Sequence, residues 1–298
     1  MYVRCSATDR ELHSNEDVGA RQSEEIRPEV RGGDEGLRRR GPVCLLTIDL
    51  GRSVSDAWVE SALEVLDGIR ALATFFVRPD AISSRLTREI ASRGHELACL
   101  GRLKPGARDC DPDRFREDAR ETKLRLEDFT GMEVAGYRAP GFSISRRTLQ
   151  ALSILAEEGY RFDSSINGQF HRSPWHAPVI VETDSGRILE VPVTAYPALG
   201  LNLPCGGGRS WRTLPVRITA AAMQRLWNNR RLPGLIALNP EEAAGVEKLA
   251  RHLTFRSVRA ALGELMTTLR MRAPEIEVRM VPRHPGFLQK FLYDLNSY

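Results

Sequence analysis

The stretch Val43-Cys44-Leu45-Leu46-Thr47-Ile48-Asp49 is a short apolar run that ends in a carboxylate. A buried β-strand with a polar residue at its tip has this pattern. In an α/β barrel, catalytic groups usually lie at the C-terminal ends of the strands. The sequence therefore predicts a central strand that carries Asp49 as a candidate catalytic residue.

The chain after Asp49 alternates between short apolar runs and amphipathic helical segments. Expected strands lie at 73–77, 95–99, 134–138, 160–165, 188–193, 235–238 and 277–281, whereas 167–186 reads as irregular. Expected helices begin at Pro79, at Asp111-Pro112 and at Ser145, and glycines end them. Seven or eight strands, most followed by a helix, favour an α/β barrel, and an open doubly wound sheet is the alternative.

Composition narrows the class of protein. The 298 residues suit one large barrel domain or two ordinary domains, and 42% hydrophobic content allows a sizeable core. A net charge of +4, spread over both signs, is not a nucleic-acid signature. Gly206-Gly207-Gly208 does not match the dinucleotide-binding fingerprint. Residues 1–41 are polar without an apolar period, so we expect a disordered or loosely attached tail.

The five cysteines contain no C-x-x-C pair, so neither a disulfide framework nor a zinc knuckle is expected. No apolar run approaches the length of a membrane span. Charged residues interrupt the N-terminal region, which therefore lacks the apolar core of a signal peptide. The expected location is the cytoplasm.

Several segments occur together in a recognisable order. They are Leu46-Thr47-Ile48-Asp49, Ala73-Thr74-Phe75-Phe76-Val77, Gly94-His95-Glu96, Tyr137-Arg138-Ala139-Pro140-Gly141-Phe142-Ser143 and Asp163-Ser164-Ser165-Ile166. Together they resemble the polysaccharide deacetylase family, the NodB-homology domain, over residues from about Pro42 to the C-terminus. Asn202-Leu203-Pro204 and the last 60 or so residues also resemble the C-terminal extension of a subgroup associated with exopolysaccharide and exosortase gene clusters.

The resemblance implies a distorted (β/α) barrel of the NodB-homology, glycoside hydrolase–deacetylase type. It places the tail at residues 1–41, the barrel at 42–240 and a C-terminal extension that packs on the barrel at 241–298. The family reaction removes an N-acetyl, sometimes an O-acetyl, group from a sugar in a glycan. It uses a divalent metal, typically zinc, with three protein ligands, a carboxylate base and a histidine acid.

The catalytic residues of the family carry over only in part. Asp49 matches the base, and the resemblance implies that Arg138 orients it. The resulting ion pair is expected to keep Asp49 ionised. Asp163 matches the later Asp-Ser-Ser segment. At the position of the acid histidine this chain has Asn239, which cannot transfer a proton near neutral pH.

The metal ligands of the family do not carry over. Leu50, Gly51 and Arg52 occupy the positions where the ligand aspartate should follow the base, and Leu100 and Lys104 replace the two histidines. We therefore expect no metal cofactor and a catalytically degenerate site. The candidate substrate-binding residues are Arg52, Arg102, Lys104, Asp163 and Asn239.

Two alternatives remain open at this point. One is an active N-deacetylase without a metal or with a site rebuilt from His171, His176, Cys205 or His252. The other is a non-catalytic protein that binds glycan or serves as a scaffold for exopolysaccharide biosynthesis proteins. Phe170, Trp175 and Trp211 fall in loops where they could stack on sugar rings, although ordinary packing is the more frequent role of such aromatics. The expected ligand is a glycan or glycan precursor, not nucleic acid.

Overall fold

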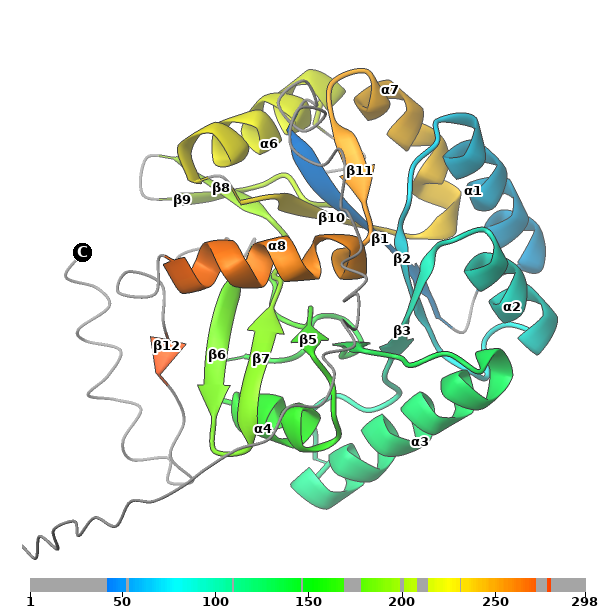
Figure 1. The fold of residues 1–298 in the computed structure, drawn as a ribbon, viewed down its shortest axis with the longest axis vertical. Helices are drawn as coiled ribbons and strands as arrows, with labels where there is room; N and C mark the ends of the chain where they lie inside the picture. The colour runs from blue at the N-terminus through cyan, green and yellow to red at the C-terminus, as the bar shows by residue number, and fades with distance from the viewer. Residues whose placement is uncertain are drawn as a thin grey trace, which may run out of the picture. The chain divides into compact units, whose positions relative to one another are not determined.

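A mainly parallel β-sheet organises the chain (Figure 1). The computed structural model describes residues 42–51, 54–108, 110–145, 147–168, 178–198, 201–207, 214–230, 232–271 and 278–279. The predicted tail, residues 1–41, lies outside this part of the chain. Within the described residues, no helix is long and apolar enough to cross a membrane.

The sheet follows the order β10-β1-β2-β3-β4-β5-β7-β6-β12, and β11 also pairs with β1. Its strands are β1 (Val43–Leu50), β2 (Thr74–Val77), β3 (Glu96–Leu100), β4 (Gly136–Arg138), β5 (Phe162–Asp163), β6 (Val179–Thr183), β7 (Gly186–Glu190), β10 (Gly234–Leu238), β11 (Thr254–Arg256) and β12 (Val278–Arg279). All pairings in it are parallel except the β6–β7 hairpin. A separate antiparallel pair joins β8 (Ala195–Ala198) and β9 (Leu201–Pro204).

The first five strands lie beside one another in chain order, whereas a doubly wound sheet reverses its strand order at a switch point. The helices are α1 (Asp56–Gly68), α2 (Ser84–Ser92), α3 (Pro112–Thr130), α4 (Gln150–Glu157), α6 (Val216–Arg230), the 3-10 helix η2 (Pro240–Gly245), α7 (Val246–Ala250) and α8 (Val258–Met271). Most of them surround the strands, whereas α8 lies across them (Figure 1). The predicted (β/α) barrel-type fold is confirmed.

Local sequence signals set some helix ends and not others. Asp111 caps α3, because its side chain accepts a 2.9 Å hydrogen bond from the amide of Arg114, and Gly131 ends the helix in the left-handed conformation. The expected start at Pro79 is wrong, since α2 begins after Ser83, whose side chain caps it. The expected start at Ser145 is also wrong, because the regular α4 begins only at Gln150.

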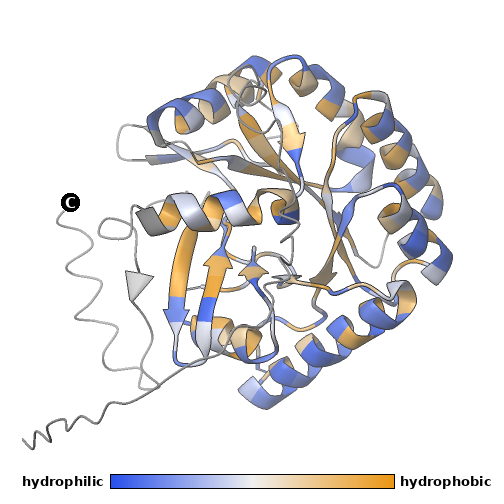
Figure 2. Ribbon diagram, viewed as in Figure 1, coloured by the Kyte–Doolittle hydropathy of each residue, from blue (hydrophilic) through white to orange (hydrophobic). Residues whose placement is uncertain are grey.

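Buried apolar side chains form two layers, one between the strands and the outer helices and one on the inner face of the sheet. Figure 2 shows that hydrophobic residues are concentrated in the strands, whereas the outer helices alternate between hydrophobic and hydrophilic residues. Alternation along β1 places Leu46, Ile48 and Leu50 in the outer layer and Leu45 in the inner layer. The buried face of α8 joins the inner layer through Val258, Ala261, Leu265 and Leu269. This helix therefore fills the interior from the side where the strands begin.

The second half of the chain differs from the expectation in two hairpins, β6–β7 and β8–β9, and in the additional strand β11. Residues 179–183 form β6, inside the region predicted to be irregular, and pair with β7 around a turn at Gly186, which has a φ of +132°. Farther on, Gly207 approaches β10 so closely that a Cβ there would lie 2.0 Å from the carbonyl oxygen of Ala237. A glycine is required there because any side chain would collide with the backbone of β10.

Candidate functional site

Asp49 and Arg138 come together at the C-terminal ends of two parallel strands of the same sheet. Asp49 ends the interior row of β1, and Arg138 ends β4, which β2 and β3 separate from β1 in the sheet. The Nη1 atom of Arg138 lies 2.5 Å from Oδ1 of Asp49. Asn239 follows β10, whose Leu238 is the register partner of Ile48, so Asn239 comes next to Asp49 at the same sheet edge. Asp49, Arg138 and Asn239, which occupies the position expected for the family's acid histidine, therefore lie at the same end of the fold.

Arg138 is fully buried and nearly all of its hydrogen-bonding capacity is used. Its Nε donates to the carbonyl oxygen of Ser164 at 3.0 Å and its Nη2 donates to the hydroxyl of Ser164 at 2.7 Å. Its Nη1 also donates to the hydroxyl of Thr47 at 3.0 Å, and that hydroxyl in turn donates to the carbonyl oxygen of Ile236. A buried guanidinium group is stable when its donors are satisfied in this way.

Two aromatic rings enclose the guanidinium group. The Cζ atom of Arg138 lies 3.8 Å from the ring centroid of Phe76 and 4.9 Å from that of Phe142. Phe142 has a φ of +54°, which is unfavourable for a residue with a side chain. The loop that contains Phe142 thus carries a strained residue next to the site, as functional loops often do.

Burial and charge act in opposite directions on Asp49. Burial is the larger effect and raises the pKa of Asp49 above its ordinary value, whereas the charge and hydrogen bond of Arg138 lower it. The Asp49 side chain nevertheless keeps 22% of its surface exposed. Burial lowers the pKa of Arg138, but an arginine remains charged at any physiological pH. A partly exposed carboxylate with a raised pKa has the properties of a general base.

A second pair of acids, Asp163 and Glu190, lies behind this site. The two residues are register partners on β5 and β7, and both are fully buried. Asp163 accepts hydrogen bonds from the amide and hydroxyl of Ser165 at 2.9 and 2.6 Å, and Glu190 accepts one from the amide of Ile166 at 3.1 Å. Sequence reasoning identified Asp163 and missed Glu190. The signal for Glu190 was a charged residue inside the apolar run Ile188-Leu189-Glu190-Val191.

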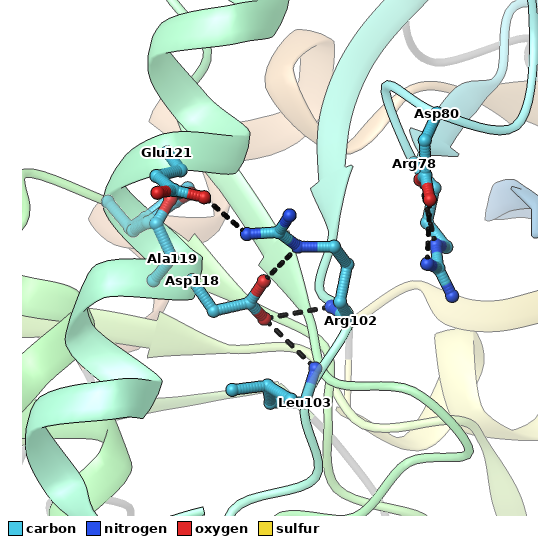
Figure 3. A network of polar contacts seen from close by, with 8 residues as sticks. Arg78, Asp80, Arg102, Leu103, Asp118, Ala119 and Glu121 are labelled. Atoms are coloured by element: carbon cyan, nitrogen blue, oxygen red, sulfur yellow. Dashed lines mark hydrogen bonds and ion pairs between the residues drawn. The ribbon is translucent and has the colours of Figure 1, made fainter.

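The basic residues predicted to bind substrate have different surroundings. Arg102 lies against α3, where its Nε contacts Asp118 at 2.6 Å and its Nη2 contacts Glu121 at 2.5 Å (Figure 3). Asp118 also accepts hydrogen bonds from the amides of Arg102 and Leu103. Lys104 is exposed, and its Nζ lies 3.6 Å from the place of a Cβ on Gly141. Arg52 lies outside the described residues.

The donor set at the aligned ligand positions does not fit a divalent metal. Leu50 packs in the outer apolar layer, away from the interior. A Cβ on Gly51 would lie 3.9 Å from Cδ2 of Leu100, so these two positions meet as apolar neighbours. Lys104 has no lone pair to offer while it is charged. Within the described part of the chain, no group of three or more His, Cys, Asp or Glu side chains is placed to hold a metal ion.

Of the four residues named for a rebuilt metal site, the structure describes only Cys205 and His252. His171 and His176 lie outside the described residues, as do Phe170, Trp175 and Trp211. Cys205 is buried, its Sγ donates to the carbonyl oxygen of Thr194 at 3.6 Å, and burial raises the pKa of its thiol to about 12. His252 is exposed after α7. A thiol with this pKa is a poor metal ligand at neutral pH.

Comparison with solved structures supports the fold. A proposed polysaccharide deacetylase from Mycobacterium smegmatis superposes with a TM-score of 0.57 at 19% identity, covering 83% of this chain and 96% of that one. A polysaccharide deacetylase from Bacillus cereus gives 0.46 at 17% identity, covering 72% and 91%. A CE4 family pseudoenzyme from Bacillus anthracis gives 0.42 at 14% identity, covering 80% and 63%. The first of these similarities supports the fold, and at 19% identity it concerns the fold alone.

Comparison of the sequence with family models divides the chain into two segments. No curated protein sequence shows significant similarity to it. Residues 37–161 match the model of the polysaccharide deacetylase family. Residues 165–261 match a domain of unknown function, DUF3473. The first of these segments is thus similar to polysaccharide deacetylases, and the second is similar to a domain of unknown function.

Proposed function

We propose that this protein binds a glycan or glycan precursor in carbohydrate metabolism, specifically that of exopolysaccharides, and has lost the metal-dependent deacetylation of its relatives. Asp49 and Arg138 would define the floor of the binding site at the C-terminal ends of the strands. The exposed Lys104 and Asn239 lie on segments that follow β3 and β10, so they are placed to contact an anionic or hydroxyl-rich sugar.

One observation carries this proposal. The Asp49–Arg138 ion pair is intact at 2.5 Å, whereas Leu50, Gly51 and Leu100 at the aligned ligand positions offer no metal donor. A protein can keep a substrate-binding site after it loses catalytic activity, because recognition of the sugar and activation of water depend on different residues. Exopolysaccharide biosynthesis proteins are the proposed protein partners.

Two measurements test the proposal together. Elemental analysis of the protein, purified after exposure to excess zinc, is expected to show less than one equivalent of bound metal. Calorimetric titration with acetylated amino-sugar oligomers is expected to show saturable binding that Lys104→Gln and Asp49→Asn weaken, while Arg85→Ala serves as an exposed control. One equivalent of retained zinc contradicts the loss of the metal site, and the absence of binding to any glycan contradicts the binding role.

A second candidate, hydrolysis without a metal, is favoured by the raised pKa of Asp49 and its partial exposure. In this reaction Asp49 takes a proton from water as the oxygen attacks the acetyl carbonyl carbon. The carbon–nitrogen bond then breaks, the amine takes a proton from solvent, and acetate leaves. Acetate release from acetylated amino-sugar oligomers that Asp49→Asn abolishes would establish this function. Binding without acetate release would favour the first proposal.

A further inference from the structure

The polar groups that hold Arg138 in place come from both matched segments of the chain and from the short link between them. Arg138 itself lies in the first matched segment, residues 37–161, whereas Ser164 lies in the link and Glu190 lies in the second, residues 165–261. Ser164 accepts two hydrogen bonds from Arg138, and its hydroxyl donates to the carbonyl oxygen of Val191 at 2.7 Å. The position of the guanidinium group therefore depends on the backbone after β5.

That backbone is in turn fixed by the buried acids. Asp163 accepts hydrogen bonds from the amide and the hydroxyl of Ser165. That hydroxyl in turn accepts a 2.7 Å hydrogen bond from the amide of Ala139, the residue after Arg138. The Oε1 atom of Glu190 accepts a hydrogen bond from the amide of Ile166. The other oxygen of Glu190, Oε2, is buried and has no hydrogen-bond partner that satisfies normal geometry within the described residues.

We propose that Glu190 is a positioning residue of the Asp49–Arg138 site, and that it acts in its neutral, protonated form beside an ionised Asp163. Two ionised carboxylates, buried side by side with Arg138 as the nearby cation among the described residues, would repel each other strongly. A proton on Oε2 of Glu190 removes that repulsion and gives the orphaned oxygen a donor directed at Asp163. Asp163 keeps its charge because Ser165 gives it two hydrogen bonds.

The directions of the pKa shifts of Asp163 and Glu190 agree with this arrangement. Burial raises the pKa of both groups, but the neighbouring Asp163 raises that of Glu190 further, whereas hydrogen bonds from Glu190 and Ser165 and the charge of Arg138 lower that of Asp163. The inference rests on the proposed function only in taking Asp49 and Arg138 as the working pair. Its test uses the pKa of Asp49, which is defined whether or not a glycan binds.

The first measurement locates the proton by infrared spectroscopy of the full-length protein at about pH 8, where an ordinary carboxyl group is ionised. The wild type is expected to show the carbonyl band of a buried protonated acid, and Glu190→Gln is expected to remove it. Glu96→Gln, at a buried carboxyl group elsewhere in the sheet, is the matched control and should leave most of the band. A band that persists in Glu190→Gln and disappears in Asp163→Asn would overturn the assignment.

The second measurement separates positioning from simple electrostatics. With isotope-labelled aspartate and Asp49→Asn to assign the signal, NMR titration follows the pKa of Asp49. Glu190→Gln preserves a neutral group and should leave this pKa unchanged. Asp163→Asn, or Ser165→Ala if that variant does not fold, should raise it by about one unit because Arg138 loses its support. A shifted pKa of Asp49 in Glu190→Gln, or a lowered or unchanged pKa of Asp49 in Asp163→Asn and Ser165→Ala, would contradict this arrangement.

Discussion

Glu96, at the start of β3, accepts a 2.8 Å hydrogen bond from the backbone amide of Arg259, in the first turn of α8. The same Oε2 accepts a 2.5 Å hydrogen bond from the hydroxyl of Thr74, which itself accepts one from the amide of Val258. The first amides of α8 thus find acceptors on β2 and β3. A carboxylate at a helix N-terminus is favourable, and here it fixes the helix that fills the interior.

This contact predicts how stability depends on pH. Burial raises the pKa of Glu96 from 4.5 to about 7, although Thr74 and Arg259 partly oppose the shift. The folded state therefore holds its proton more tightly than the unfolded state does. The stability contributed by this protonation is complete below the unfolded pKa of about 4.5 and is lost as pH rises through about 7, a change of about 3 kcal/mol.

Glu96→Gln should remove this part of the pH dependence. Denaturant unfolding at about pH 5 and about pH 8 measures it, and the variant should gain stability relative to the wild type at the higher pH. Glu64→Gln, at an exposed position on α1, is the control and should show no such difference. An equal effect of Glu96→Gln at both pH values would show that the proton is not taken up by Glu96.

Removing Arg138 should be far more costly than removing an arginine at the surface. Arg138→Ala leaves Asp49 without its ion-pair partner and leaves the acceptors of Ser164 without a donor. We expect a loss of about 3–5 kcal/mol in the free energy of unfolding. Arg85→Ala breaks two ion pairs in which the arginine side chain is 64% exposed, and should cost no more than about 1 kcal/mol. Similar losses for both variants would refute the importance of the buried pair.

Gly101, directly after β3, should not tolerate a side chain. A Cβ there would lie 1.9 Å from the hydroxyl oxygen of Tyr137, which is buried and has no hydrogen-bond partner among the described residues. We expect Gly101→Ala to cost about 1–3 kcal/mol through overpacking, whereas Tyr137→Phe alone should be nearly neutral.

The double variant tests the cause of that loss. Because Tyr137→Phe removes the atom nearest to the new methyl group, it should recover about 1 kcal/mol of the Gly101→Ala penalty. Chemical unfolding of the four proteins gives the coupling energy. Strict additivity would mean that the hydroxyl is not the source of the clash.

Arg102 and Lys104 should separate stability from binding. Arg102→Gln removes charged contacts to the buried Asp118, so it should lower the free energy of unfolding by about 1–3 kcal/mol. Lys104→Gln changes an exposed residue and should leave stability within about 0.5 kcal/mol. Glycan titration of both variants should show the larger loss of affinity for Lys104→Gln. The opposite ranking would place the ligand against α3.

The sequence by itself determined the periodic features of the protein. The apolar run ending at Asp49 forms β1, Asp111 and Gly131 bound α3, and the ordered repeat of strands and helices produces the barrel-type sheet. These features depend on neighbours within a few residues, where strand alternation, helix caps and left-handed glycines leave local patterns. The absence of metal donors at the aligned ligand positions remains a prediction from the sequence, because it rests on residue type alone.

Only the tertiary structure decided which charges meet. Arg138 pairs with a residue 89 positions away in the chain, Arg102 lies against α3, and Glu190 lies beside Asp163 because β7 is the neighbour of β5. No local pattern records these distances, since sheet order and register set them. The charge of Glu190 inside the run at 188–191 could be read from the sequence, but its partner Asp163, the burial of the pair and its place behind Arg138 come from the folded arrangement of strands.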